Sequence, residues 1–313
     1  MEYLISLVIP TNGVVEWVFP VLNSIYCQSI DENLFEVIVV DNGSNIEFES
    51  LMIDFANNHK NLIYKKTTAT LFQNQIEGFR LASGEFIKFV NHRTILIEGS
   101  LLNLIDFVEK NRIEKPITYF LNNTSEISTP ENYLSSFDSF IYGLGKYSSW
   151  SGGVSCWRED LDDILGHVEL NSNDLFPHLI FVFYFKKDRR YQIDNSTLWR
   201  EISTSSVKKG KYDVFYAFGI QFVEAINKLY LQNKISSETR EFVLDENEKF
   251  VAQIYLTHII LKKPCSYDLS TSKDSLNYYY GLKKIQKLAL ENLMCRIKSK
   301  IFRGGNDFGR EEL

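Results

Sequence analysis

Along the first third of the chain, short runs of apolar residues alternate with segments in which apolar residues recur every three to four positions. Residues 4–9 and 35–40 are apolar at almost every position, which is typical of strands buried on both faces of a parallel sheet. Residues 14–29 repeat apolar side chains every three to four positions, as a helix that connects two such strands requires. The alternation then predicts helices at 48–57, 72–82 and 100–109, and strands at 62–65, 86–90 and 117–121. We therefore predict a doubly wound α/β sheet, mostly parallel and flanked by helices, with ligands at the carboxyl ends of its strands.

The pattern changes in the second half of the chain. Residues 122–153 are rich in Asn, Ser, Thr and Gly, which indicates loops and short elements that contact a ligand. Residues 179–185 predict one more helix and residues 191–198 one more strand. From residue 212 the spacing is helical to the end. We place a boundary near residue 205, which gives an α/β domain at 1–205 and a helical C-terminal extension at 206–313.

The composition of the chain argues against several classes of protein. The 313 residues carry a net charge of −6, which argues against a nucleic-acid binder because such proteins need a concentrated basic surface. The four cysteines form no CxxC pair and predict neither a zinc site nor disulfides. The N-terminus has a strand pattern rather than a signal-peptide pattern, and no apolar run reaches the length of about 18 residues that indicates a membrane span. We expect a cytoplasmic protein.

Three segments at the predicted strand ends carry the candidate chemistry: SLVIPTNG, EVIVVDNGSN and NQIEGFRLASGEFIKFVNHRTIL. Their order resembles glycosyltransferase family 2, whose enzymes have the GT-A fold and use nucleotide-sugar donors. The resemblance is strong over residues 1–100 and weak over 101–200. It implies that Pro10, Thr11 and Asn12 contact the base and ribose of the donor, and that Asp41 accepts a hydrogen bond from a pyrimidine ring. It also implies that Asn42 and Ser44 shape the turn after Asp41 at the donor site, and that Asn74 lies near the sugar or pyrophosphate.

The residues themselves favour the same site. An acid at the carboxyl end of a parallel strand can accept a hydrogen bond from a ring N–H, and a following glycine lets the backbone turn sharply. Taken alone, the segment from Asp41 to Ser44 is explained as well by a turn in which Ser44 caps a helix. Its position after the second strand, between the Pro10–Thr11 strand end and the strand after Gly84, favours the nucleotide site.

The turn after the fourth strand departs from the family pattern. Asn91, His92 and Arg93 stand where relatives have the acids of the DXD motif, which hold Mg²⁺ or Mn²⁺ against the diphosphate. An amide, an imidazole and a guanidinium do not make the oxygen-rich site that these hard cations need. We expect no metal site and no cofactor other than the donor itself.

Two hypotheses follow from this departure. In the first, the protein is a metal-independent transferase in which Arg93, with His92 or Lys88, offsets the charge of the diphosphate, and Asn91 adds to donor binding. In the second, it is a catalytically inactive nucleotide-sugar-binding or scaffold subunit of a glycan-assembly complex. The retained nucleotide-side residues favour the first. A simpler explanation of Arg93 is a structural ion pair at the surface. The acids at 159–163 could form a substitute metal site, but they are explained as well by a favourable interaction with a helix N-terminus.

Inverting members of the family use an Asp or Glu to deprotonate the acceptor hydroxyl. The best match is Asn173-Asp174 before an apolar run, so Asp174 is our candidate base. His178 is the alternative base, because a histidine titrates near neutral pH. An N-cap aspartate and a buried histidine explain the two residues equally well. Trp150, within residues 149–153, offers an apolar face as a wall of the acceptor site.

Residues 275–303 mix apolar side chains with lysine and arginine. Such a basic amphipathic helix fits an anionic membrane surface, and it fits equally a helix packed on the domain with a solvated charged face. The membrane alternative implies a lipid-linked glycan acceptor and a location at the inner face of the membrane. We thus predict an inverting, metal-independent glycosyltransferase of bacterial-type surface polysaccharide synthesis, with a nucleotide-sugar donor and a carbohydrate acceptor. A nucleotidyltransferase is disfavoured because no Gly-rich phosphate loop follows the first strand.

Overall fold

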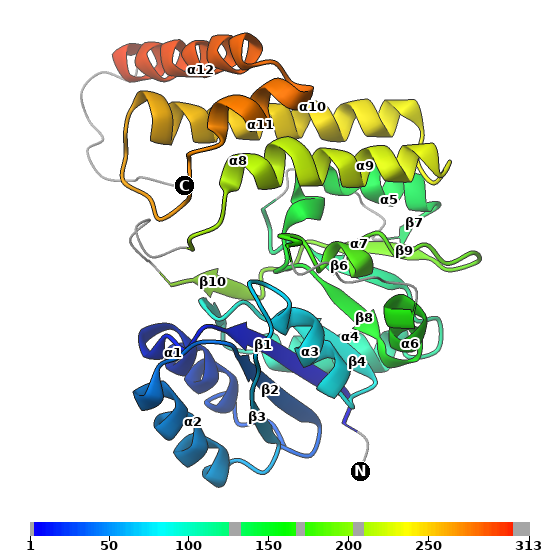
Figure 1. Ribbon diagram of the computed structural model, residues 1–313. Helices are drawn as coiled ribbons and strands as arrows, with labels where there is room; N and C mark the ends of the chain where they lie inside the picture. The colour runs from blue at the N-terminus through cyan, green and yellow to red at the C-terminus, as the bar shows by residue number, and fades with distance from the viewer. Residues whose placement is uncertain (1–2, 125–132, 167–172, 203–209, 303–313) are drawn as a thin grey trace. The chain divides into compact units, whose positions relative to one another are not determined.

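A computed structural model of the chain describes residues 3–124, 133–166, 173–202 and 210–302 (Figure 1). The chain divides into two compact units. The first comprises Met1–Ser203 together with Leu229–Arg240, and the second comprises Thr204–Lys228 together with Glu241–Leu313. The first unit contains the α/β part of the protein, and the second is helical.

A five-stranded sheet in the order β3-β2-β1-β4-β8 lies at the centre of the first unit (Figure 1). Its strands are β1 (Ile5–Thr11), β2 (Phe35–Asp41), β3 (Leu62–Lys66), β4 (Phe86–Phe89) and β8 (Ser155–Trp157). The first four strands are parallel, and β8 runs antiparallel to β4. Every residue of β1 and β2 is buried, as their continuous apolar runs predict. The predicted α/β class and the mostly parallel sheet are confirmed.

Helices cover both faces of this sheet. The apolar sides of α1 (Val15–Tyr26), α2 (Ile46–Asn58) and α4 (Ser100–Asn111) pack in one core with alternate residues of β1, such as Leu7 and Ile9. The side chain of Val8 points to the opposite face, where α3 (Asn74–Leu81) approaches so closely that a Cβ on Gly78 would lie 2.4 Å from Val8 Cγ1. Because β1, β2 and β4 are parallel, their carboxyl ends lie at one edge of the sheet.

The remaining elements of the first unit differ in part from the prediction. Strands β6 (Ile117–Phe120), β9 (Tyr191–Asp194) and β7 (Tyr133–Leu134) form a second sheet in the order β6-β9-β7, and β5 (Thr94–Leu96) pairs with β10 (Trp199–Glu201). Helices α6 (Arg158–Gly166) and α7 (Leu179–Val182) are short. Helix α5 (Phe137–Leu144) lies in the segment for which we expected loops and short elements; a capping box between Ser136 and Ser139 begins it.

The second unit contains α8 (Val214–Tyr216), most of α9 (Phe222–Leu231) and of α10 (Ser237–Ile254), α11 (Ser272–Tyr279) and α12 (Leu282–Phe302). The expected single helix over 275–303 is two helices, because Gly281 adopts φ +82° between α11 and α12. Ile285 and Ala289 bury one side of α12. None of the helices in the described ranges is both long and apolar enough to cross a membrane.

Candidate functional site

The carboxyl ends of β1 and β2 are joined through their loops. The N–H of Asn42 donates to the Thr11 carbonyl at 3.1 Å, and the N–H of Gly13 donates to Thr11 Oγ1 at 3.1 Å. A Cβ on Gly43 would lie only 2.0 Å from the carbonyl oxygen of Asn12. The two loops therefore contact each other through their backbones, and only glycine fits at position 43.

Asp41 is fully buried at the end of β2. Its Oδ1 accepts the Gly43 N–H at 2.7 Å, and its Oδ2 accepts from Tyr64 Oη at 2.9 Å and from Lys66 Nζ at 2.8 Å. Burial and the bond to Asp41 raise the pKa of Tyr64, which stays a neutral donor. Since a carboxylate has about four acceptor positions, three are occupied within the protein. Lys66, with 36% of its side chain exposed, also lies 3.7 Å from Glu49 Oε2.

The other residues expected to bind the base and sugar divide into two groups. Asn42 donates its amide to the carbonyls of Ala69 and Leu71, and buried Asn74 donates to those of Thr11 and Val40. Asn42 therefore holds the backbone of the loop after β3, and Asn74 holds the carboxyl ends of β1 and β2. In the second group, Pro10 is buried within β1, whereas Asn12 and Ser44 are exposed. The N-cap of α2 is Asn45 and not Ser44: the Asn45 side chain accepts from the N–H groups of Glu47 and Phe48.

The turn after β4 is tied to β1. Asn91 Oδ1 accepts the N–H of Arg93 at 3.0 Å, which fixes the turn, and His92 Nδ1 lies 3.0 Å from Thr11 Oγ1. The same oxygen also accepts the Gly13 N–H. Burial, and secondarily the charge of Arg93, lower the pKa of His92 to about 3. His92 is therefore neutral, and Arg93 carries the charge of the turn.

Arg93 is held by stacking. Its guanidinium carbon lies 5.4 Å from the ring centre of Trp17 on α1, and the same indole makes an edge contact with His92 at 5.1 Å. Arg93 forms no ion pair with any carboxylate in the described ranges, and its Nε is buried without a hydrogen-bond partner there. The surface ion pair that would explain Arg93 in structural terms is thus not found in this part of the chain. Sequence reasoning missed Trp17.

Lys88 does not belong to this turn, contrary to our expectation. Its side chain is fully buried, and Nζ donates to the carbonyls of Phe89, Gly152 and Val154 at 2.8, 2.6 and 3.3 Å. The ring of Trp199 lies 4.7 Å from Nζ. Burial lowers the pKa of Lys88 well below the ordinary value of 10.5. Lys88 is a structural donor, since no diphosphate can reach a side chain enclosed in this way.

The two candidate bases have different surroundings. Asp174 is half-buried, its Oδ1 accepts the Phe176 N–H at 2.8 Å, and burial raises its pKa. His178 is buried, and its Nε2 donates to the Ser149 carbonyl at 2.9 Å. Burial lowers the pKa of His178 to about 4, so the ring is neutral at physiological pH. Trp150 is 42% exposed.

The donor set around this site does not fit a hard divalent cation. In the described ranges there is no group of three His, Cys, Asp or Glu side chains placed to hold a metal ion. The acids at 159–163 are instead occupied: Asp160 pairs with Lys186 and Arg189, Glu159 with Lys115 and Arg189, and Asp162 with Arg158. We therefore derive no step through a metal.

Residues 6–143 match Glycosyl transferase family 2. The match covers the four parallel strands and the strand ends described above but not β8, and it confirms the resemblance seen in the sequence. Residues 6–143 thus resemble a family 2 glycosyltransferase domain, and the mostly parallel sheet flanked by helices is GT-A-like. A comparison with curated proteins found no significant match.

Solved structures share the fold at low sequence identity. S. aureus TarS 1-349 in complex with UDP-GlcNAc has a TM-score of 0.52 and 16% identity over 96% of this chain and 81% of that one. The mannosyltransferase PcManGT from Pyrobaculum calidifontis, in complex with GDP-Man and Mn²⁺, has a TM-score of 0.54 and 14% identity over 96% of this chain and 88% of that one. This chain spans 46% of a longer S. aureus TarS structure, with a TM-score of 0.50 and 14% identity.

Proposed function

We propose that the protein transfers a sugar from a nucleotide-sugar donor to a carbohydrate acceptor, with inversion and without a bound metal ion. The observation that carries this proposal is Arg93. Its guanidinium has no carboxylate partner in the described ranges and is stacked on Trp17 at the end of β4. A guanidinium donates two parallel hydrogen bonds to phosphate oxygens, and its charge stabilises a diphosphate leaving group. His92 is neutral and packs on the same indole as Arg93, and Asn91 holds the turn that carries both residues.

The nucleotide base would lie at the edge formed by β1, β2 and β3. Asp41 has one acceptor position left, and its buried carboxylate orients the ammonium of Lys66 and the hydroxyl of Tyr64. We therefore propose that Lys66 donates to a carbonyl oxygen of the base, while Asp41 positions it. UDP-GlcNAc and GDP-Man, the donors bound by the structural neighbours, both have bases with such an oxygen.

Asp174 is the base that we propose for the acceptor hydroxyl. It is half-buried rather than enclosed, and its raised pKa makes it a better proton acceptor than an ordinary aspartate. His178 is less suited to that task. Its Nε2 is bonded to a backbone carbonyl, and burial holds its pKa near 4. We assign His178 a positioning role between the Asp174 segment and Ser149.

The test is turnover of a panel of UDP- and GDP-sugars in the presence of EDTA, with the anomer of the product determined by NMR. We expect turnover that EDTA does not abolish and a product of inverted configuration. Turnover that appears only after Mg²⁺ or Mn²⁺ is added, or a product of retained configuration, would contradict the mechanism. Donor binding without turnover on any acceptor would favour the inactive binding subunit instead.

We further propose that the acceptor is a lipid-linked glycan of bacterial-type surface polysaccharide synthesis at the inner face of the membrane. The support comes from α12. Leu290, Met294 and Ile297 are each about half exposed, and their spacing of four and three residues places them on one side of the helix. The same side continues toward the N-terminus to exposed Lys283 and Lys287. An exposed apolar stripe beside lysines fits an anionic lipid surface.

Vesicle co-sedimentation tests this part of the proposal. The full chain should pellet with vesicles that contain phosphatidylglycerol and not with pure phosphatidylcholine. Met294→Glu should abolish pelleting, because it places a negative charge in the apolar stripe. Ile113→Glu is the matched control, since Ile113 is an exposed apolar residue of the first unit. Equal pelleting of the Met294 variant and the control would exclude α12 as the contact.

A further inference from the structure

The loop of residues 147–154, which we call the aromatic loop, is held by buried donors from three separate elements. The Tyr119 hydroxyl on β6 lies 2.7 Å from the Tyr147 carbonyl and 2.5 Å from that of Trp150. His178 Nε2, just before α7, donates to the Ser149 carbonyl. Lys88 Nζ on β4 donates to the carbonyls of Gly152 and Val154, as described above. These contacts fix the backbone of the loop at five of its eight residues.

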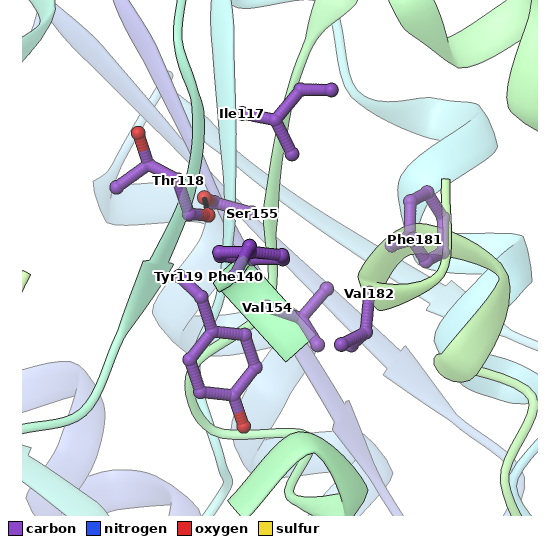
Figure 2. Close-up of a pocket in the computed structure, with 8 residues that line it drawn as sticks. All are labelled: Ile117, Thr118, Tyr119, Phe140, Val154, Ser155, Phe181 and Val182. Atoms are coloured by element: carbon purple, nitrogen blue, oxygen red, sulfur yellow. Dashed lines mark hydrogen bonds between the residues drawn. The ribbon is translucent and has the colours of Figure 1, made fainter. Parts of the chain in front are cut away.

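The packing behind the loop is equally tight. Tyr119 and Val154 line a small cavity together with Phe140 and Phe181 (Figure 2). A Cβ on Gly153 would lie 2.1 Å from the Tyr119 ring. The aromatic loop therefore has little freedom to move, and the side chains that it presents outward are held in place in advance of any ligand.

Trp150 is the large side chain that this loop exposes. Its indole is 42% accessible and meets the ring of Tyr147 edge-on at 4.6 Å between centres, with the rings at 80°. The Tyr147 hydroxyl is itself tied to the Thr124 carbonyl at 3.2 Å. The 42% of Trp150 that stays in water adds no burial energy to the fold. Together with Tyr147, it offers a flat apolar face whose position is fixed by the backbone of the loop.

The aromatic loop lies beside the turn that carries Arg93. Gly152 and Lys88 line one small pocket together with Asn91 and Thr94, the residues on either side of His92 and Arg93. The aromatic loop at Gly152 therefore borders the same pocket as the two ends of the turn that carries Arg93.

We propose that Trp150, braced by Tyr147, is an acceptor subsite that binds the apolar C–H face of a pyranose ring. A pyranose has a flat face of ring C–H groups that matches an indole, whereas an acyclic polyol has no fixed face of this kind. The inference rests on the proposed function, because it concerns the acceptor of the same reaction. The inference predicts that the acceptor is a glycan whose reacting end is a cyclic sugar.

Saturation-transfer NMR on the full chain tests the subsite. The probes are methyl β-D-glucopyranoside, methyl β-D-galactopyranoside and methyl N-acetyl-β-D-glucosaminide, and sorbitol is the acyclic control. We expect at least one pyranoside to receive saturation on its ring C–H protons and sorbitol to receive none. Trp150→Ala should weaken that binding about tenfold, because it removes one apolar face, and Trp150→Phe should restore most of it.

Tyr142→Ala is the matched control, since Tyr142 is an equally exposed aromatic residue of the first unit, on α5. It should leave the signal unchanged. The proposal is overturned if no pyranoside binds, if sorbitol gives the same signal, or if Trp150→Ala binds like the unchanged protein. Titration with UDP and GDP separates this failure from that of the proposed function: loss of the sugar signal alone contradicts only the subsite.

Discussion

The buried imidazole of His178 makes stability depend on pH in a defined direction. Burial lowers its pKa from the ordinary 6.5 to about 4 in the folded protein. Between these two values the unfolded chain binds a proton that the folded chain does not, so the free energy of unfolding falls as the pH falls from 6.5 towards 4. At about pH 5, where the unfolded ring is almost wholly protonated and the folded ring is not, the loss relative to about pH 7.5 is roughly 2 kcal/mol.

His178→Gln isolates this contribution. The glutamine amide can still donate to the Ser149 carbonyl but does not titrate. The free energy of unfolding of each protein is measured in urea at about pH 7.5 and at about pH 5. Between these two pH values, the histidine protein should lose about 2 kcal/mol more than the variant does. His92, with a pKa lowered to about 3, contributes in the same direction but equally in both proteins. A difference that is independent of pH, or one that favours the histidine protein in acid, would refute a buried neutral His178.

Two further predictions concern the aromatic loop. Gly153→Ala should lower the free energy of unfolding by about 3 kcal/mol, because its Cβ would meet the Tyr119 ring. Gly152→Ala is the control: its Cβ meets nothing within 4 Å, so the free energy of unfolding should change by less than about 0.5 kcal/mol. Similar thermal shifts for both variants would contradict the packing. Lys88→Met should cost about 2 kcal/mol in urea unfolding, because it removes the Lys88 donor from the Gly152 carbonyl and one of the two donors to the Val154 carbonyl. Exposed Lys110→Met should be neutral. A stabilising Lys88→Met would show that removing the buried amine outweighs the loss of these bonds.

The sheet could be predicted because its signal is local. Continuous apolar runs define β1 and β2, and the residues directly after them define the edge at which a ligand binds. Helix α5 was missed because the segment was judged by its polar composition, although Phe137, Phe140, Ile141 and Leu144 recur at helical spacing. In α12, the glycine before Leu282 was a signal for the break in the expected helix.

The site was harder to predict because its contacts join residues far apart in the sequence. Lys88 was taken for a charge at the tip of β4, but the period of two places it on the same face as Phe86, in a strand that is buried throughout. Trp17 lies four residues before Val21 on the buried side of α1, and nothing in the sequence indicates that its ring reaches Arg93. The donors that hold the aromatic loop come from residues 88, 119 and 178, so only the folded chain brings them together.

The central claim is that Arg93 provides the charge that a metal ion provides in related enzymes. Calorimetric titration in EDTA tests it directly, by comparing nucleoside diphosphate with the corresponding monophosphate. We predict that the protein prefers the diphosphate by about tenfold or more, that Arg93→Gln removes this preference, and that Arg80→Gln, which alters an exposed arginine paired with Glu77, retains it. The same preference in Arg93→Gln, or a preference that appears only when Mn²⁺ is added, would contradict the claim.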